Sequence, residues 1–191
     1  MRFRLVYEGP LHSNGTPTEK HAIRRQLHGQ LKELWAQQEP LKRLSDMPDY
    51  RLPGAYEPGP QSGIGLRQLA THFARCGFQF VPLVTALYWL ICSLDILFLR
   101  RENPGAVVSG GDIDNRLKTL LDGLRLPKCD EIIEKPEPDE EPMFCLLEED
   151  RLITEVTVTT DRLLRPPGQG QSPTDVLLII SAEVEQTTRP W

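Results

Sequence analysis

The sequence predicts a single α+β domain over residues 1–191, built on one mixed β-sheet of about four to five strands with two to three helices. A chain of 191 residues with 39% hydrophobic residues can fill one sizeable core and is marginal for two. Stretches with the two-residue period of strands interleave with stretches that have the 3.6-residue period of helices. Their order lacks the regular rhythm of a doubly wound fold, and this favours a mixed sheet.

The N-terminal half predicts a strand, a long helix, a loop and a short helix. Residues 2–8 alternate apolar and polar side chains, as a half-buried strand does. Thr18 is placed to cap a helix from about residue 19 to 38, whose apolar residues recur on one face. Four prolines and four glycines between residues 48 and 65 predict a long irregular loop. A short helix over about 66–75 follows.

The second half predicts four strands and one further helix. Residues 78–84 and 88–101 are rich in β-branched and aromatic side chains, which pack well on pleated surfaces. Leucines at helical spacing predict a compact helix over about 114–124. The last two strand candidates are 152–160 and 175–185, and the turn-rich connection between them suits a hairpin.

The charge of the chain is unevenly distributed. The formal net charge of -5 argues at first against a protein that binds nucleic acid over its whole surface. Between Lys128 and Asp150, however, ten acidic and two basic residues give -8, so the rest of the chain carries +3. We interpret residues 128–149 as an acidic insertion in a mildly basic body.

Four cysteines without a C-x-x-C pair predict unpaired thiols in a reducing compartment, so we expect a cytoplasmic protein. The N-terminus alternates like a strand and does not resemble a signal peptide. The long apolar run from Phe78 to Leu99 is interrupted by Pro82 and Asp95, so no membrane helix is expected.

The densest polar signal lies at the start of the helix predicted over 114–124. In an extended segment, Asp112 and Asp114 project to the same side and can share one hard cation. Lys118 follows Asp114 by one helical turn, where its ammonium can hold a phosphate oxygen. The plain alternative is that Asp114 is an N-cap, Asp112 a loop residue, and Asp114 with Lys118 an ordinary surface pair.

The pattern Asp112-x-Asp114-Asn115-x-x-Lys118, followed by Asp122, resembles the signature of the RusA-type Holliday junction resolvases. The five polar positions of that motif are all present. Residues 149–155 resemble a later family pattern that starts a strand with two adjacent acids, here Glu149 and Asp150. The stretch around Asn14 is similar to the family's Pro/Ser/Asn turn, although this match is weaker.

The resemblance implies a mixed α/β homodimer that cleaves branched DNA, including Holliday junctions, in recombination and repair. It implies an endonuclease in which Asp112, Asp114 and Asp150 bind one or two Mg2+ ions, with Mn2+ as a possible substitute. Lys118 would stabilise charge at the scissile phosphate. Asn115, Asp122, Asn14 and Glu149 would be supporting residues, with Asp122 orienting Lys118 or capping an interaction within the helix. The candidate DNA-binding residues are Arg24, Arg25, Arg100, Arg101 and Arg116.

The role of the acidic insertion differs between the candidate functions. A nuclease does not require residues 128–149, which would be a solvated flap, a gate that limits cutting, or a dock for another protein. The alternative is a non-catalytic nucleic-acid-binding or regulatory relative that uses this segment for a protein partner. If Asp150 points away from Asp112 and Asp114, this alternative becomes the better interpretation. A metal enzyme for small phosphorylated substrates fits the charge, but the sequence has no P-loop.

Overall fold

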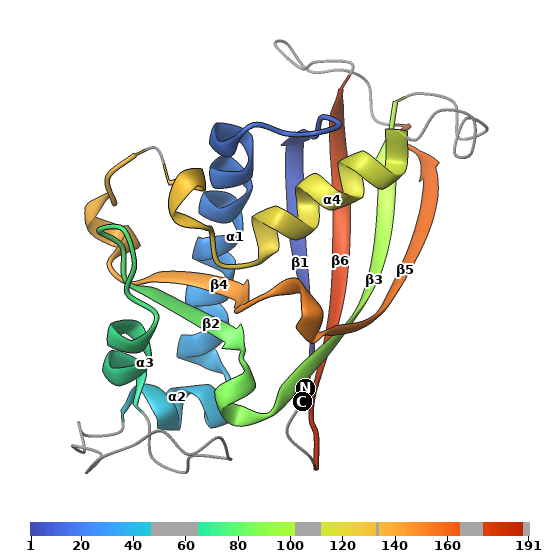
Figure 1. The fold of residues 1–191 in the computed structure, drawn as a ribbon. Coiled ribbons are helices and arrows are strands. Elements are labelled where there is room, and N and C mark those ends of the chain that lie inside the picture. Colours follow the sequence, from blue (N-terminus) through green and yellow to red (C-terminus); the bar gives the residue numbers. More distant parts are fainter. Residues whose placement is uncertain (47–64, 102–111, 133, 165–173, 189–191) are drawn as a thin grey trace.

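A computed structural model describes residues 1–46, 65–101, 112–132, 134–164 and 174–188. α1 and α4 lie on one face of a four-stranded mixed sheet (Figure 1). α3 contacts β2 of a second, two-stranded sheet, and α2 contacts α1 and α3. The predicted α+β class with a mixed sheet is therefore confirmed. The loop predicted over 48–65 lies almost wholly outside the described residues.

The large sheet has the strand order β1-β6-β3-β5. β6 (Asp175–Gln186) is antiparallel to both β1 (Arg2–Pro10) and β3 (Leu90–Arg100), and β3 is parallel to β5 (Ile153–Arg162). The predicted hairpin between the last two strands is wrong, because β3 lies between β5 and β6. A parallel β3–β5 pair needs a long crossover, and the chain from α4 to β4 supplies it.

The helices are α1 (Pro17–Gln37), α2 (Glu39–Ser45), α3 (Leu66–His72) and α4 (Asp112–Leu124). α1 begins earlier than predicted. Thr16, and not Thr18, is its N-cap: the Thr16 hydroxyl accepts from the backbone N–H of Glu19, whose carboxylate accepts from the N–H of Thr16. Pro17 at the first helical position has no N–H that would need a partner there.

The small sheet was not predicted in full. β2 (Phe80–Val84) pairs in parallel with β4 (Met143–Leu147), and all residues of both strands are buried. β4 lies inside the segment 128–149, so the end of the predicted insertion belongs to the core. Short 3-10 helices surround it: η1 (Ala86–Tyr88), η3 (Cys129–Glu131), η4 (Pro138–Glu140) and η5 (Asp150–Leu152).

The core lies between the helices and the inner face of the large sheet. Val176, Leu178 and Ile180 of β6 are buried, as are Ile23 and Leu27 of α1. At the free edge of β1, the side chain of Gln30 accepts from the N–H of Val6 (2.8 Å) and donates to its carbonyl (2.7 Å). None of the helices in the described residues is long and apolar enough to cross a membrane.

The cysteine prediction is wrong for two of the four residues. Cys76 and Cys129 form a disulfide that joins the segment before β2 to η3. Their separation of 53 residues gave no spacing signal. Cys92 and Cys145 are unpaired and buried, and burial raises the pKa of each thiol to about 12.

Candidate functional site

The motif residues lie at the start of α4, but Asp112 and Asp114 are within the helix and not in an extended segment before it. α4 begins at Asp112, so Asp114 lies in the first turn and is not the N-cap. Residues two apart on a helix do not face one another, so the expectation that Asp112 and Asp114 project to one side is not met by this backbone. The side chain of Asp112 lies outside the described side chains.

Asp114 and Lys118 share one face of α4 and are both exposed. Neither side chain forms an ion pair or hydrogen bond with another described residue, and they do not pair with each other. The alternative of an ordinary surface pair is therefore not what the structure shows. Asn115, which is partly buried, accepts through its carbonyl from the hydroxyl of Thr119 (3.1 Å).

The turn after β1 reaches the same helix. The N–H of Gly15 donates to the buried hydroxyl of Thr119 (2.8 Å), the residue that follows Lys118. A Cβ at Gly15 would lie 2.3 Å from the Thr119 methyl carbon, so only glycine allows this approach. Asn14 is exposed and has a left-handed backbone (φ 56°). The structure thus brings the predicted supporting residue Asn14 next to α4, although the two motifs are distant in sequence.

Three consecutive acids precede β5, and the structure uses them differently. Glu148 accepts from the Thr85 hydroxyl (2.7 Å) and the Ala86 N–H (2.9 Å), which fixes the start of η1. Glu149 pairs with Arg151 (2.5 Å). Asp150 is exposed and interacts with no other described side chain. Of these acids, Asp150 is therefore the one whose carboxylate is available to a ligand.

Asp150 nevertheless lies apart from the start of α4. η5 lies below α4, at the beginning of β5, whereas α4 begins near the end of β3 (Figure 1). Cys92 of β3 is level with Ile153 of β5, and Arg100 is level with Arg162. At about 3.3 Å per residue, those two levels are about 30 Å apart. Among the described residues no three His, Cys, Asp or Glu side chains group as metal ligands, and the three-aspartate site stays a prediction.

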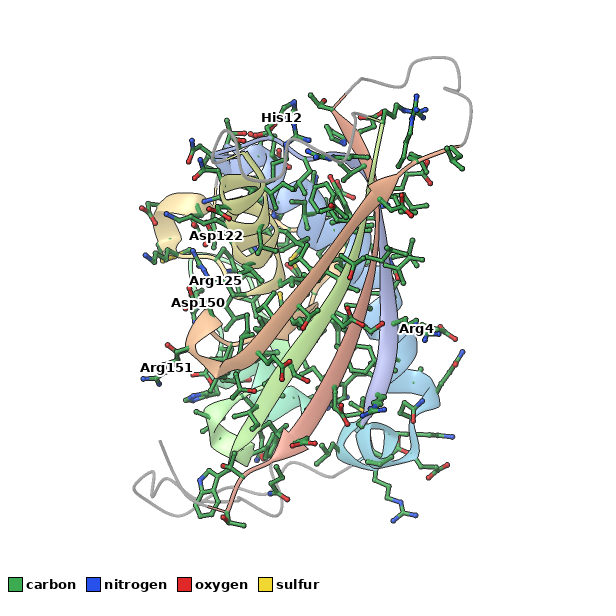
Figure 2. The ribbon with its side chains drawn as sticks, turned by 90° about the vertical axis from the view of Figure 1, so that its right-hand side faces the viewer. Arg4, His12, Asp122, Arg125, Asp150 and Arg151 are labelled. Carbon is green, nitrogen blue, oxygen red and sulfur yellow. A yellow bond between two sulfur atoms is a disulfide. The ribbon has the colours of Figure 1, made fainter. Side chains whose placement is uncertain are left out.

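Asp122 has a different partner from the one expected. Its carboxylate binds the Lys20 ammonium (2.7 Å) and the Arg125 guanidinium (2.7 Å), on the side of α4 that faces α1 (Figure 2). Burial favours the neutral acid, but hydrogen bonds from Lys20 and Arg125 outweigh it and lower the pKa of Asp122. Asp122 thus holds α4 to α1 and does not orient Lys118.

The candidate phosphate-binding arginines are largely occupied by the protein itself. Arg24 is 1% exposed and donates to the carbonyls of Asp122 (2.7 Å) and Arg125 (3.0 Å), so its expected role in DNA binding is corrected to a structural one. Arg100 and Arg116 are also buried, and Arg101 is half-buried. All three already interact with other groups of the protein.

The acidic segment packs on α1, so the interpretation of residues 128–149 as a solvated flap is wrong. Arg25 binds Glu134 (2.9 Å), Glu137 (3.3 Å) and the buried Glu140 (2.5 Å). The opposite charges of α1 and this segment are visible in the sequence and could have indicated this contact. Arg25 is consequently engaged in neutralising carboxylates and is not free for phosphate.

His28 of α1 also holds the acidic segment in place, through two hydrogen bonds of its ring. The Nδ1 atom of His28 accepts from the N–H of Phe144 (2.9 Å), so the Nε2–H can donate to the carbonyl of Asp139 (3.0 Å). This arrangement requires the neutral imidazole. Burial, followed by the nearby charge of Lys32, lowers the pKa of His28, although the carbonyl and carboxylates of the segment oppose this.

Comparison with known proteins does not assign this chain to a family. No protein-family model, curated protein or solved structure matches the chain. The resemblance to the RusA-type resolvases therefore depends on the motif residues themselves.

Proposed function

We propose that this chain is a metal-dependent endonuclease that cleaves branched DNA such as Holliday junctions, with its reactive centre at the start of α4. One observation carries the proposal: Asp114 and Asp150, two of the acids that would bind metal, are exposed and have no side-chain partner among the described residues. Neighbouring acids such as Asp122, Glu148 and Glu149 are engaged by other residues. Lys118, one helical turn from Asp114, is also exposed and has no partner in the part of the chain that the structure describes.

In the arrangement that the structure shows, the three aspartates would not bind one metal ion together. Carboxylate oxygens are the ligands that Mg2+ prefers, and no cationic side chain of the described residues pairs with Asp114. However, Asp112 and Asp114 are two positions apart in the first turn of α4, which is not the spacing of residues that face one another on a helix, and Asp150 lies toward the other end of the sheet. Joint binding by all three therefore requires the first turn of α4 to open and η5 to approach it.

Lys118 has a role that does not depend on that rearrangement. Its exposed ammonium on the Asp114 face can bind a non-bridging phosphate oxygen and stabilise charge that develops there. Two-fold symmetry would serve an enzyme that must cut two strands of a junction in the same way.

The test is cleavage of four-way, three-way and linear DNA in Mg2+, in Mn2+ and in chelator. We expect metal-dependent nicking of branched DNA, reduced at least 100-fold in Asp114→Asn and Asp150→Asn. Asp46→Asn is the matched control, because Asp46 is an exposed acid at the end of α2. Absence of metal-dependent nicking by the folded protein on every branched substrate would overturn the proposal.

The separation of Asp150 from the start of α4 meets the condition under which the sequence favours a second candidate. The nuclease stays the first proposal only because Asp114, Lys118 and Asp150 are exposed and have no side-chain partner among the described residues. A non-catalytic relative would bind branched DNA without cutting it and would not need Asp114 and Asp150 to meet. Gel-shift measurements in chelator distinguish the two functions. The binder is supported if four-way DNA is bound but never nicked, and if Asp150→Asn leaves the affinity unchanged.

A further inference from the structure

The two outer strands of the large sheet differ in how their free edges are protected. At the β1 edge, the side chain of Gln30 bonds both backbone groups of Val6. β5 forms the other edge, and no strand of the described residues lies beyond it (Figure 1). Lysines, prolines or covering segments usually protect such edges, because open edges pair with other chains. β5 contains neither lysine nor proline.

The hydrogen bonds of β5 show which of its residues face the free edge. The N–H of Leu163, just after the strand, donates to the carbonyl of Arg100 of β3 (2.7 Å). Backbone groups of successive residues point alternately to the two sides of a strand, so beyond the register shift at its start the odd-numbered residues of β5 bond to β3. The residues whose N–H and C=O groups point to the free edge are Val156, Val158 and Thr160. These groups have no partner in the part of the chain that the structure describes.

The side chains along this edge are apolar on the side of the helices. Val156 and Val158 are in register with buried residues of β3, so both valines face the helices. Val158 packs against the core, whereas Val156 is 37% exposed. Leu164, which follows the strand closely, is 83% exposed. An apolar side chain on an added strand would cover Val156 and remove its surface from water.

On the outer face of the sheet, the same edge is acidic. Glu155 and Asp161 of β5 are exposed and point to this face, as does the exposed Asp95 of neighbouring β3. They are the only charged side chains that these two strands direct to the outer face. The basic side chain of Arg162 stands in the row on the helix side, at the end of the strand. An added strand would therefore meet one apolar row and one acidic row.

We propose that the free edge of β5 binds an extended peptide of another protein, in which basic and apolar residues alternate. The peptide adds a strand to the sheet through the backbone groups of Val156, Val158 and Thr160. Its lysines or arginines lie beside Glu155 and Asp161 on the outer face, and its apolar residues lie beside the valines on the helix side.

The charges of this edge disfavour a second copy of the chain as its occupant. Two fully aligned antiparallel copies of residues 155–161 would place Glu155 of each copy opposite Asp161 of the other. Like charges directly opposite one another destabilise a strand pair. A basic peptide turns the same positions into attractive contacts, so the acidic row favours a basic strand over self-pairing.

The test is fluorescence anisotropy of a labelled peptide in which four lysines alternate with three valines, matched to residues 155–161 and titrated with the full chain. We expect saturable binding with a dissociation constant below about 100 μM. A peptide of the same composition with contiguous lysines should bind at least tenfold more weakly. Equal binding of the two peptides would reflect general attraction to an acidic protein and would overturn the proposal, as would the absence of binding.

A proline at the edge tests the added strand itself. Val156→Pro removes an N–H that points to the free edge and leaves the bonds to β3 in place. It should weaken binding of the alternating peptide at least tenfold, whereas Val156→Thr keeps the N–H and should bind like the wild type. Circular dichroism confirms that both variants are folded. Binding that Val156→Pro leaves unchanged would use another surface and would overturn the proposal.

Charge reversal tests the acidic row independently of the backbone. Glu155→Lys should weaken binding severalfold, and Glu185→Lys is the matched control, because Glu185 is an exposed acid on β6, two strands from this edge. Equal effects of the two reversals would overturn the assignment of the acidic row. Self-association that Val156→Pro abolishes in sedimentation equilibrium would place a second copy at the edge and overturn the proposal. These measurements need neither DNA nor metal, so their outcome is independent of the proposed function.

Discussion

Two regions of the molecule contain the same kinds of charged residue in opposite states. The first is the surface of α1 that contacts the acidic segment and the end of α4, and the second is the start of α4. In the first region, Arg25 binds three glutamates, and Asp122 is held by Lys20 and Arg125. In the second region, Asp114 and Lys118 are exposed and have no partner among the described residues. Sequence spacing does not distinguish these states, because packing decides which carboxylates remain free for a ligand.

The comparison also changes the meaning of the net charge. Much of the acidic excess in residues 128–149 is neutralised by α1, so the segment does not present nine free carboxylates to DNA. The same pairing removes Arg24 and Arg25 from the basic surface of the body. Each region is open to tests by substitution.

Removing the Cys76–Cys129 disulfide should have the largest effect on the region in which α1 forms its ion pairs. The Cys76–Cys129 disulfide closes a loop of 53 residues and fixes η3, next to the ion pairs. Constraint of the unfolded chain by a loop of this length is worth about 4 kcal/mol. We expect Cys76→Ser to lower the free energy of unfolding by about that amount in urea denaturation. Added reductant should lower the stability of the wild type and leave Cys76→Ser unchanged; equal responses would contradict the prediction.

Two isosteric substitutions on α4 should separate the regions directly. Asp122→Asn removes the charge between Lys20 and Arg125, and we expect it to cost about 2 kcal/mol of stability. Asp114→Asn removes an exposed, unpaired charge and should change stability by less than about 0.5 kcal/mol. Thermal and urea unfolding of both variants is the measurement. Equal losses of stability would show that Asp114 also has a structural partner.

A smaller effect is expected within the acidic segment itself. Glu140 is 3% exposed and paired with Arg25, so Glu140→Gln should destabilise the protein by about 1–2 kcal/mol. The neighbouring Asp139 is exposed and makes its contacts through the backbone carbonyl, so Asp139→Asn is the control and should be nearly neutral. Identical unfolding midpoints for the two variants would argue against a buried Arg25–Glu140 pair.

The pH dependence of the free energy of unfolding should also reflect the contact between α1 and the acidic segment, through His28. The fold holds His28 neutral, and its lowered pKa means that the unfolded chain binds a proton first as the pH falls below about 6.5. The free energy of unfolding should therefore decrease from that pH downward, by up to about 1.4 kcal/mol per pH unit for one proton. His28→Gln should flatten this slope, leaving the part due to His21, whose pKa burial also lowers.

A second loss of stability belongs to the carboxylates. Burial opposes ionisation of Glu140, Glu131 and Asp122, but their ion-pair partners, together with backbone N–H donors to the two glutamates, outweigh it and lower their pKa values in the fold. Their contribution is present above the unfolded pKa near 4 and is lost as the pH falls through the folded values. Constant stability between pH 7 and pH 3 would contradict both parts of the prediction.

Local patterns predicted most of the fold, and long-range pairing accounts for what they missed. The alternation in β1 and the leucine spacing in α4 identified those elements, because each reflects burial of one face. The hairpin error and the missed β4 have another origin. β4 is a short, fully apolar run without periodicity, and its partner β2 is about sixty residues away.

The candidate site was predictable only in part. The free residues Asp114, Lys118 and Asp150 were named from the motif, but the sequence could not show that Asp112 and Asp114 would share a helical turn. It also could not show that Arg24 would be buried, since its neighbours in space, Asp122 and Arg125, are about one hundred residues away. Such contacts depend on how α1 and α4 pack.

The side chain of Gln30 has a consequence for how this molecule can accumulate. By bonding both backbone groups of Val6, its amide takes the position of an absent neighbouring strand at the outer edge of β1. Open strand edges are templates for fibrillar growth, in which chains add one after another without limit. At this edge an incoming chain would first have to displace the amide, so the Gln30 side chain protects the free edge of β1 against such growth.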